Sequence, residues 1–175
     1  TGTNARPNGV GLRVDGSSKN TIGGALGGAG NVISGNFEDG IRIASAQGAS
    51  ENLILGNVIG LDVTGSFPLP NGLNGIKIDN ATETTIGGSA EGAGNLISGN
   101  GGCGILIKAD LGPADSNLIL GNVIGTNRGV TSTIGNQGDG IHLEGSASNT
   151  VGGTAGGARN VISGNNTHGV LIWLG

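Results

Sequence analysis

The apolar residues of this 175-residue chain occur in short alternating pieces instead of long runs. The clearest piece has the order glycine, apolar, any residue, apolar. It begins at Gly11, Gly40, Gly75, Gly104, Gly140 and Gly169. Each interval between two such pieces holds two further short apolar pieces, of the types Asn20-Thr-Ile and Asn31-Val-Ile. Because apolar residues that recur with a period of two are typical of β-strands, the pattern predicts three short strands per interval.

These pieces belong to a longer repeat. The block Asn52–Gly60 returns with an identical sequence at Asn117–Gly125, 65 residues later. The glycines that open the strands are spaced 29, 35, 29, 36 and 29 residues apart. Three strands per interval, with Gly and Asn at the bends, predict an all-β parallel β-helix, or β-solenoid. We expect about six coils that alternate between 29 and 35 or 36 residues.

The pattern fills the chain and breaks off in the middle of a repeat at both ends. We therefore expect residues 1–175 to form a single solenoid domain that is an interior portion of a longer repeat protein. Exposed strand edges at the ends of such a rod favour head-to-tail self-association.

Asparagines recur at the predicted bends, and we expect them to be structural. One corner should contain Asn31, Asn57, Asn95, Asn122 and Asn160, and another should contain Asn20, Asn52, Asn117 and Asn149, with Thr84 as a substitute. An amide at a turn can bond its own backbone or the amide of the next coil. The sequence thus predicts ladders of Asn along the solenoid.

Composition and charge narrow the class of protein. Glycine accounts for 40 residues and aromatic residues for 2% of the chain, which fits a narrow interior with little room for rings. The net charge of −4 and the few basic residues argue against a nucleic-acid partner. No stretch approaches eighteen apolar residues, so we expect no membrane insertion. Cys103 is the only cysteine, which excludes an intramolecular disulfide, and we expect it to be structural.

The recurring phrases resemble a known family. They are Asn-Thr-Ile-Gly-Gly, Gly-Ala-Gly-Asn-Val-Ile-Ser-Gly-Asn, Asp-Gly-Ile-x-Ile and Gly-Asn-Val-Ile-Gly-Leu-Asp-Val-Thr-Gly. This cadence is similar to the right-handed parallel β-helix repeat segments of large bacterial secreted or surface proteins, in the pectin-lyase-like group. The resemblance covers nearly the whole chain and implies a right-handed coil and an extracellular or cell-surface location in a bacterium. It does not choose among the lyases, hydrolases, epimerases and tailspikes of the wider group.

One outer face presents charged residues at successive coils. The third residue of each Gly-Ile-x-Ile piece points outward, and with the residues that follow it gives a candidate substrate-binding set: Arg13, Arg42, Lys77, Asp79, His142 and Glu144. The alternative is that these cations are solvated and offset by Asp15 and Asp79. Those two carboxylates should lie two coils apart, about 9.6 Å at ~4.8 Å per coil. That is the upper end of the ~6.5–9.5 Å found in inverting glycosidases.

The sequence favours neither a metal nor a cofactor. His142 and His168 are not joined by further His or Cys at ligand spacing along the chain, so we expect no zinc site. Two functions stay open. The first is a non-catalytic extracellular scaffold, stalk or surface-adhesion module. The alternative is a polysaccharide lyase or glycoside hydrolase fragment that acts on a polysaccharide or cell-surface glycan along the outer face.

Overall fold

The computed structural model describes residues 7–45 and 48–174, and within them it contains sixteen β-strands and no helix. The first sheet contains β1 (Leu12–Asp15), β4 (Ile41–Ala44), β7 (Ile76–Asp79), β10 (Ile105–Lys108), β13 (Ile141–Glu144) and β16 (Val170–Trp173). The second contains β2 (Thr21–Gly23), β5 (Leu53–Leu55), β8 (Thr85–Gly87), β11 (Leu118–Leu120) and β14 (Thr150–Val151). The third contains β3 (Val32–Ile33), β6 (Val58–Ile59), β9 (Leu96–Ile97), β12 (Val123–Ile124) and β15 (Val161–Ile162).

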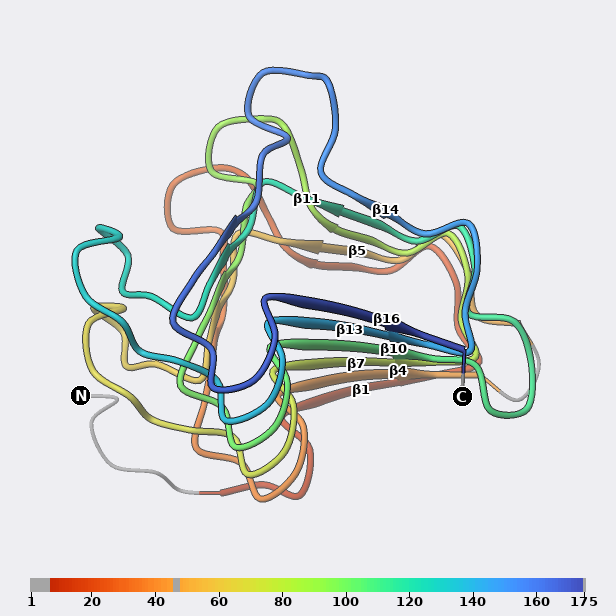
Figure 1. Ribbon diagram of the computed structural model, residues 1–175, viewed down its shortest axis with the longest axis horizontal. Helices are drawn as coiled ribbons and strands as arrows, with labels where there is room; N and C mark the ends of the chain where they lie inside the picture. Colours follow the sequence, from red (N-terminus) through yellow and green to blue (C-terminus); the bar gives the residue numbers. More distant parts are fainter. Residues whose placement is uncertain (1–6, 46–47, 175) are drawn as a thin grey trace.

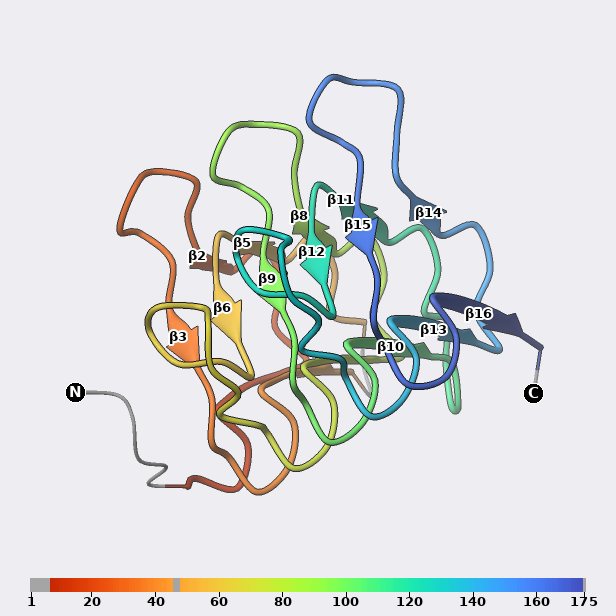
Figure 2. The same cartoon turned by 60° about the vertical axis from the view of Figure 1, so that its left-hand side comes forward.

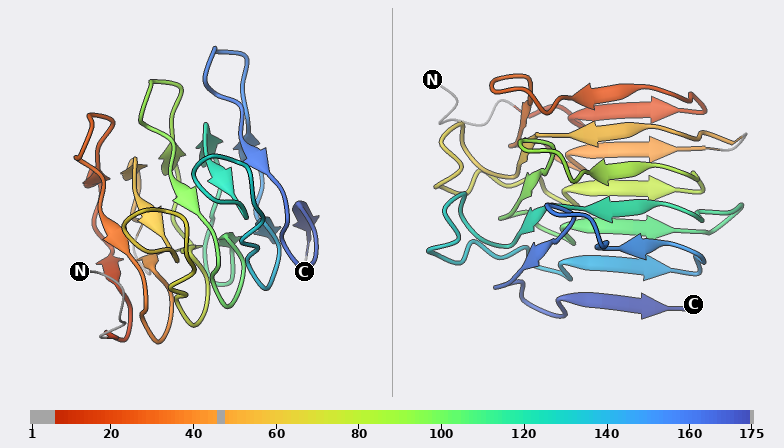
Figure 3. Two further views of the ribbon diagram at one scale, coloured as in Figure 1. Left: turned by 90° about the vertical axis from the view of Figure 1, so that its left-hand side faces the viewer. Right: turned by 90° about the horizontal axis from the view of Figure 1, so that it is seen from above.

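The strands stack as a parallel β-solenoid, as the sequence predicts. Every pairing is parallel and joins a strand to the strand three places along the chain, such as β4 to β7 and β7 to β10. Figure 1 shows the three sheets as the three walls of the coil, and Figure 3 shows the strands of one wall side by side. Six strands in the first sheet and five in each of the others give about five complete turns, close to the predicted six.

The interior is a set of aliphatic ladders. The register aligns Ile41, Ile76, Ile105 and Ile141, all fully buried, in adjacent strands of the first sheet. The buried core comprises isoleucines from all three sheets with Leu143 and three alanines, and it holds no aromatic residue. The same residue type recurs at each coil. Branched side chains at alternate positions therefore stack on one another and fill this narrow space.

Asparagine ladders hold the corners together. The amide of Asn57 donates to Asn95 Oδ1 at 3.0 Å, and the amide of Asn95 donates to Asn122 Oδ1 at 3.0 Å. At the second corner the amide of Asn20 donates to Asn52 Oδ1 at 2.9 Å and that of Asn117 to Asn149 Oδ1 at 3.0 Å, with the predicted substitute Thr84 between these two pairs. The two predicted ladders are therefore confirmed, and each buried amide satisfies backbone groups that water cannot reach.

A third ladder was not predicted. Its members are Asn36, Asn71, Asn100, Asn136 and Asn165, linked from amide to amide at 2.7–2.9 Å. This ladder is hard to recognise from the repeats, because Asn71 and Asn136 of the longer coils follow loops that have no counterpart in the shorter coils.

The longer coils carry these extra loops on the outside of the third sheet. The loops at residues 61–74 and 126–139 project from that wall in Figure 2. Leu61 packs there with Val58 and Leu96 in a small apolar cluster outside the main core. Within the part of the chain that the structure describes, no helix has the length and apolar character to cross a bilayer.

The first of these loops is organised by a carboxylate and the second by a neutral amide. Asp62 Oδ1 accepts hydrogen bonds from the backbone N–H of Ser66 and of Phe67, both at 3.1 Å. Asn127 plays the same part in the second loop, accepting from Thr131 N at 2.8 Å. Burial alone raises the pKa of Asp62, but these N–H donors outweigh burial and bring the pKa below its ordinary value.

Some corners accept only glycine. Gly87 has a φ of +82°, and a Cβ there would lie 2.0 Å from the carbonyl oxygen of Leu120 on the adjacent coil. Gly16 also has a positive φ, of +59°, but a Cβ there would meet nothing within 4 Å. Position 87 therefore requires glycine because the coils approach each other closely there, and not because of backbone conformation alone.

Candidate functional site

The outward positions of the first sheet form the columns that the sequence predicts. The register aligns Arg13, Arg42, Lys77, Leu106, His142 and Leu171. A second column aligns Asp15, Ala44, Asp79, Lys108, Glu144 and Trp173. The outward direction is confirmed, since Arg42 and Lys77 lie between fully buried isoleucines on their strands and are themselves partly exposed.

An open groove of about 640 Å³ lies over β1, β4 and β7. Arg13, Arg42, Lys77 and Asp79 line it, and residues of the loop after β10 form one wall. Asn80 fixes that wall, because its Oδ1 accepts the backbone N–H groups of residues 110, 111 and 112 at 2.8, 2.9 and 3.1 Å. The structure thus brings four of the six candidate residues together.

The charges of the groove are paired with one another. Asp79 is buried, and its Oδ2 lies 2.7 Å from Arg42 Nη2, while its Oδ1 lies 3.1 Å from Lys77 Nζ. Arg13 binds Asp15 at 2.8 Å on the exposed edge. This hydrogen bond and the charge of Asp15 raise the pKa of Arg13. Every cation of the groove therefore has a carboxylate partner, as the alternative of mutually offset charges predicts.

Asp15 and Asp79 are two coils apart, as predicted, since both pair with Ala44 of β4 between them. A glycosidase requires one carboxyl group that can protonate the leaving group and a second that is free to act as base or nucleophile. Each of these carboxylates is instead engaged by a cation. The arrangement can bind polar groups of a ligand at the rim of the groove, but it presents no unengaged carboxylate pair.

The other two candidate residues lie outside the groove and do not act as a pair. Glu144 binds Lys108 Nζ at 3.1 Å, and Lys108 also binds Asp110 at 3.2 Å. These two hydrogen bonds raise the pKa of Lys108. His142 turns away from Glu144, and its Nδ1 lies 3.1 Å from Asp139 Oδ2.

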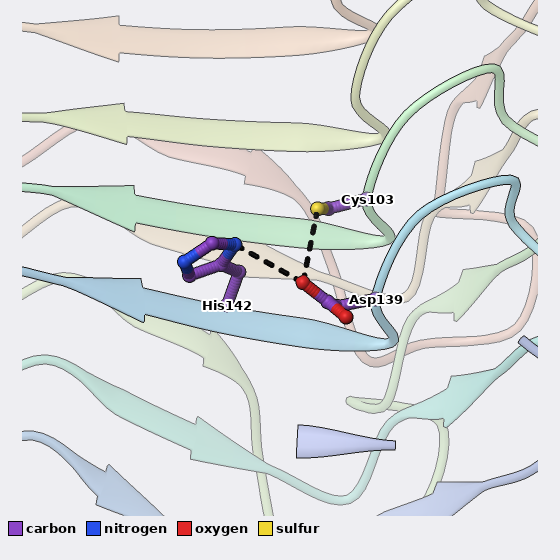
Figure 4. A group of neighbouring side chains, drawn as sticks. All are labelled: Cys103, Asp139 and His142. Carbon is purple, nitrogen blue, oxygen red and sulfur yellow. Dashed lines mark hydrogen bonds and ion pairs between the residues drawn. The ribbon is translucent and has the colours of Figure 1, made fainter. Parts of the chain in front are cut away.

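Asp139 is the centre of a second polar cluster, shown in Figure 4. Its Oδ2 faces both His142 Nδ1 and the sulfur of Cys103, which is 4.0 Å away. Its Oδ1 accepts a hydrogen bond from the Thr167 hydroxyl and another from the backbone N–H of His168 at 3.0 Å, and His168 Nδ1 lies 2.7 Å from it. The side chains of Asp139 and His142 are mostly buried.

The surroundings lower the pKa of Asp139 and raise the pKa of Cys103. Burial raises the pKa of Asp139, but the hydrogen bonds from Thr167 and His168 outweigh burial and bring it below its usual range. Burial also raises the pKa of the Cys103 thiol. Together with His142, the two groups supply a sulfur, an oxygen and a nitrogen within 4.8 Å of one another, which are atoms that can hold a metal ion.

This cluster is not visible as ligands at close spacing along the chain, because its members are far apart in the sequence. Cys103 precedes Asp139 by 36 residues, and His168 follows it by 29. These separations are the lengths of one coil, so the residues meet only when the coils stack. The alignment of Cys103-Gly104 with Asp139-Gly140 and His168-Gly169 was the available signal.

Comparisons with protein-family models, with curated proteins and with solved structures returned no match to this chain.

Proposed function

We propose that this chain is a rigid, non-catalytic β-helix scaffold: a spacer, stalk or adhesion module of a secreted or cell-surface bacterial protein. The location rests on the resemblance of its repeats to segments of the pectin-lyase-like group. The observation that supports the scaffold most directly is the uninterrupted Asn ladder, which repeats the same bonds at every coil. A repeat held by identical contacts between neighbours favours a structural role.

The charged face supports the same proposal. A catalytic site on this face would require polar groups free to act on a substrate, whereas both oxygens of Asp79 lie at ion-pair distance from Arg42 and Lys77. The Arg42–Asp79 contact joins β4 to β7 and stabilises the stack, while the Lys77–Asp79 contact lies within β7. The charged residues of the groove therefore act mainly to stabilise the stacked coils.

Within residues 7–45 and 48–174, no strand pairs with the outer edges of β1 and β16, and these edges suggest how such a scaffold extends. Each is the outer strand of a six-stranded parallel sheet and leaves backbone N–H and C=O groups open to a further strand. A neighbouring coil, of this chain or of a second copy, continues the parallel ladder. Head-to-tail association is part of the proposal, and a rise of light scattering with protein concentration tests it.

A deletion that leaves the sequence around its junction unchanged tests the scaffold proposal. Because Asn52–Gly60 and Asn117–Gly125 are identical, removal of residues 53–117 joins Asn52 to Leu118 and leaves the local sequence unchanged. We expect a folded rod with an unchanged β-type circular dichroism spectrum, shortened by two coils, about 9.6 Å at ~4.8 Å per coil. X-ray scattering in solution measures the length. An unfolded product would contradict the proposal.

The catalytic alternative is tested on the intact protein. The purified chain is incubated with acidic and neutral polysaccharides, and release of reducing or unsaturated ends is measured. We expect no turnover. Turnover that is abolished in Lys77→Ala and Asp79→Ala would overturn the non-catalytic proposal.

A second candidate function is glycan recognition along the groove, as part of a polysaccharide lyase or glycoside hydrolase. The observation that favours it is the open groove itself, with charged side chains of both signs at its rim. A glycan array with the wild type and Lys77→Ala tests it. Binding that the variant loses supports recognition by this face, and the absence of any bound glycan removes this candidate.

A further inference from the structure

The residues directly before the strand-opening glycines form a column at one corner of the solenoid. They are Val10, Asp39, Asn74, Cys103, Asp139 and His168. Neighbours in this column bond across coils, since the amide of Asn74 donates to Asp39 Oδ1 at 2.9 Å and His168 Nδ1 lies 2.7 Å from Asp139 Oδ1. Side chains here are therefore brought together by the stacking of coils.

The column contains the same corner twice, with different neighbours. The sequence Asp-Gly-Ile-x occurs at Asp39, where x is Arg42, and at Asp139, where x is His142. Asp39 has Val10 and Asn74 on the adjacent coils, and Arg42 turns to Asp79. The three equivalent positions around Asp139 instead hold residue types that can act as metal ligands: Cys103, His142 and His168.

The geometry directs one oxygen of Asp139 at two potential ligands. Thr167 and His168 occupy Oδ1, which leaves Oδ2 towards Cys103 Sγ at 4.0 Å and His142 Nδ1 at 3.1 Å. Bonds of 2.0–2.3 Å around a tetrahedral zinc ion separate neighbouring ligand atoms by about 3.3–3.8 Å. The ligand atoms of Cys103 and His142 lie within 4.8 Å of each other, so side-chain movements of up to about 1 Å would produce that geometry.

The backbone beside the sulfur leaves it room. A Cβ at position 138 would lie 3.0 Å from Cys103 Sγ, and Gly138 has none. The adjacent coils are joined there by the hydrogen bond from Gly138 N to Gly102 O at 2.8 Å. The ligand atoms thus project from strands and bends that the fold fixes.

The same residues do not form a nucleophilic cysteine site. In such a site the histidine lies between the cysteine and the carboxylate and withdraws the thiol proton. Here Asp139 lies between Cys103 and His142, as Figure 4 shows.

We propose that Cys103 Sγ, Asp139 Oδ2 and His142 Nδ1 bind one divalent cation of the zinc class, with the fourth position open to water. A thiolate, an imidazole and a carboxylate form a donor set that suits Zn²⁺ and the related Co²⁺. Thr167 and His168 bond the other carboxylate oxygen and so orient Asp139 towards the ion, as hydrogen-bond partners of metal ligands do. The ion would join β10 to β13, and the proposal departs from the sequence-based expectation that no metal is bound.

Cobalt and zinc titrations of the reduced, metal-stripped chain test the site. We expect calorimetry to give one Zn²⁺ per chain, with release of a proton from the thiol on binding. Co²⁺ should produce an absorption band of thiolate-to-metal charge transfer, which Zn²⁺ then displaces. Co²⁺ should also quench Trp173, the only tryptophan, because its ring centroid is 6.5 Å from that of His142.

Three variants separate the ligands from their surroundings. Cys103→Ala should abolish the charge-transfer band and weaken Zn²⁺ binding by more than ~100-fold, which exceeds the loss caused by removing a hydrogen-bond partner of a ligand. His168→Asn should keep the band and weaken binding by about 10–100-fold. Asp39→Asn, at the matching corner, should change neither.

The absence of a charge-transfer band in the wild type would overturn the proposal, as would unchanged Zn²⁺ affinity in Cys103→Ala. The wild-type spectrum decides even if that variant fails to fold, because Cys103 is the only possible source of a thiolate in the chain. Ions held at exposed His168 alone would give no such band.

Discussion

The substitution Asn122→Ala tests whether the Asn ladders stabilise the solenoid. Asn122 is fully buried, and its Oδ1 accepts two hydrogen bonds from Asn95, one from the backbone N–H and one from the side-chain amide, both at 3.0 Å. Its own amide donates to the carbonyl oxygen of Ile86 at 2.9 Å. Truncation would leave these groups inside a corner that water does not reach.

The expected loss follows from the groups left without partners. Each buried donor that loses its acceptor costs about 1–3 kcal/mol, so the two donors of Asn95 give a loss of about 2–6 kcal/mol in the free energy of unfolding. Asn31→Ala is the matched control. Asn31 belongs to the same ladder, but it is exposed, and its side chain gives one hydrogen bond, to Asn57 at 3.0 Å. We expect that variant to lose about 1 kcal/mol or less.

Equilibrium urea unfolding followed by far-UV circular dichroism measures both variants. The ratio of the two losses is informative because the chemical change is the same in each. Equal losses, or a loss below about 1 kcal/mol for Asn122→Ala, would show that stacked amides contribute no more than isolated surface hydrogen bonds. The reasoning about the ladders would then be refuted.

Three further predictions use the same unfolding assay. Arg42→Ala should cost about 1.5–3 kcal/mol because it removes charged hydrogen bonds from a buried carboxylate, while Arg13→Ala, at an exposed pair, should leave the urea midpoint almost unchanged; similar shifts of the midpoint would argue against the buried network. The lowered pKa of Asp62 gives stabilisation that is complete above its unfolded value of 3.8 and is lost as the pH falls through the folded value. Asp62→Asn should therefore fold, as the neutral residue of the equivalent loop indicates, and its urea midpoint should fall less than that of the wild type between pH 7 and pH 3; an equal fall would contradict this origin. Gly87→Ala should prevent normal folding, whereas Gly16→Ala should cost only about 1–2 kcal/mol of backbone strain, and equal effects would show that the close approach at the first position is unimportant.

Much of the fold could be predicted because a solenoid repeats local rules. The glycine that begins each Gly-Ile-x-Ile piece marks the same point of every coil, so the alignment of Ile41 with Ile76 follows directly from counting. The same counting placed Asn57 beside Asn95. Nearest-neighbour contacts between equivalent residues dominate such folds, and these contacts are visible in the sequence as periodicity.

The site was less predictable because its chemistry depends on how individual side chains turn. The sequence placed Arg42, Lys77 and Asp79 on one face, but it did not show that Asp79 would engage both cations. His142 and Glu144 share a strand and an outward direction, yet one binds Asp139 and the other Lys108. Rotamer choice and the residues before each strand decide these pairings, and neither follows the repeat.

The loops of the longer coils have a mechanical consequence. Those at residues 61–74 and 126–139 contact each other, since Arg128 N donates to Gly65 O at 3.1 Å. The wall formed by the third sheet thereby has a second layer that is joined from one long coil to the next. Bending the rod away from this wall has to stretch the contact between the two loops, so that contact adds resistance to flexure in this direction.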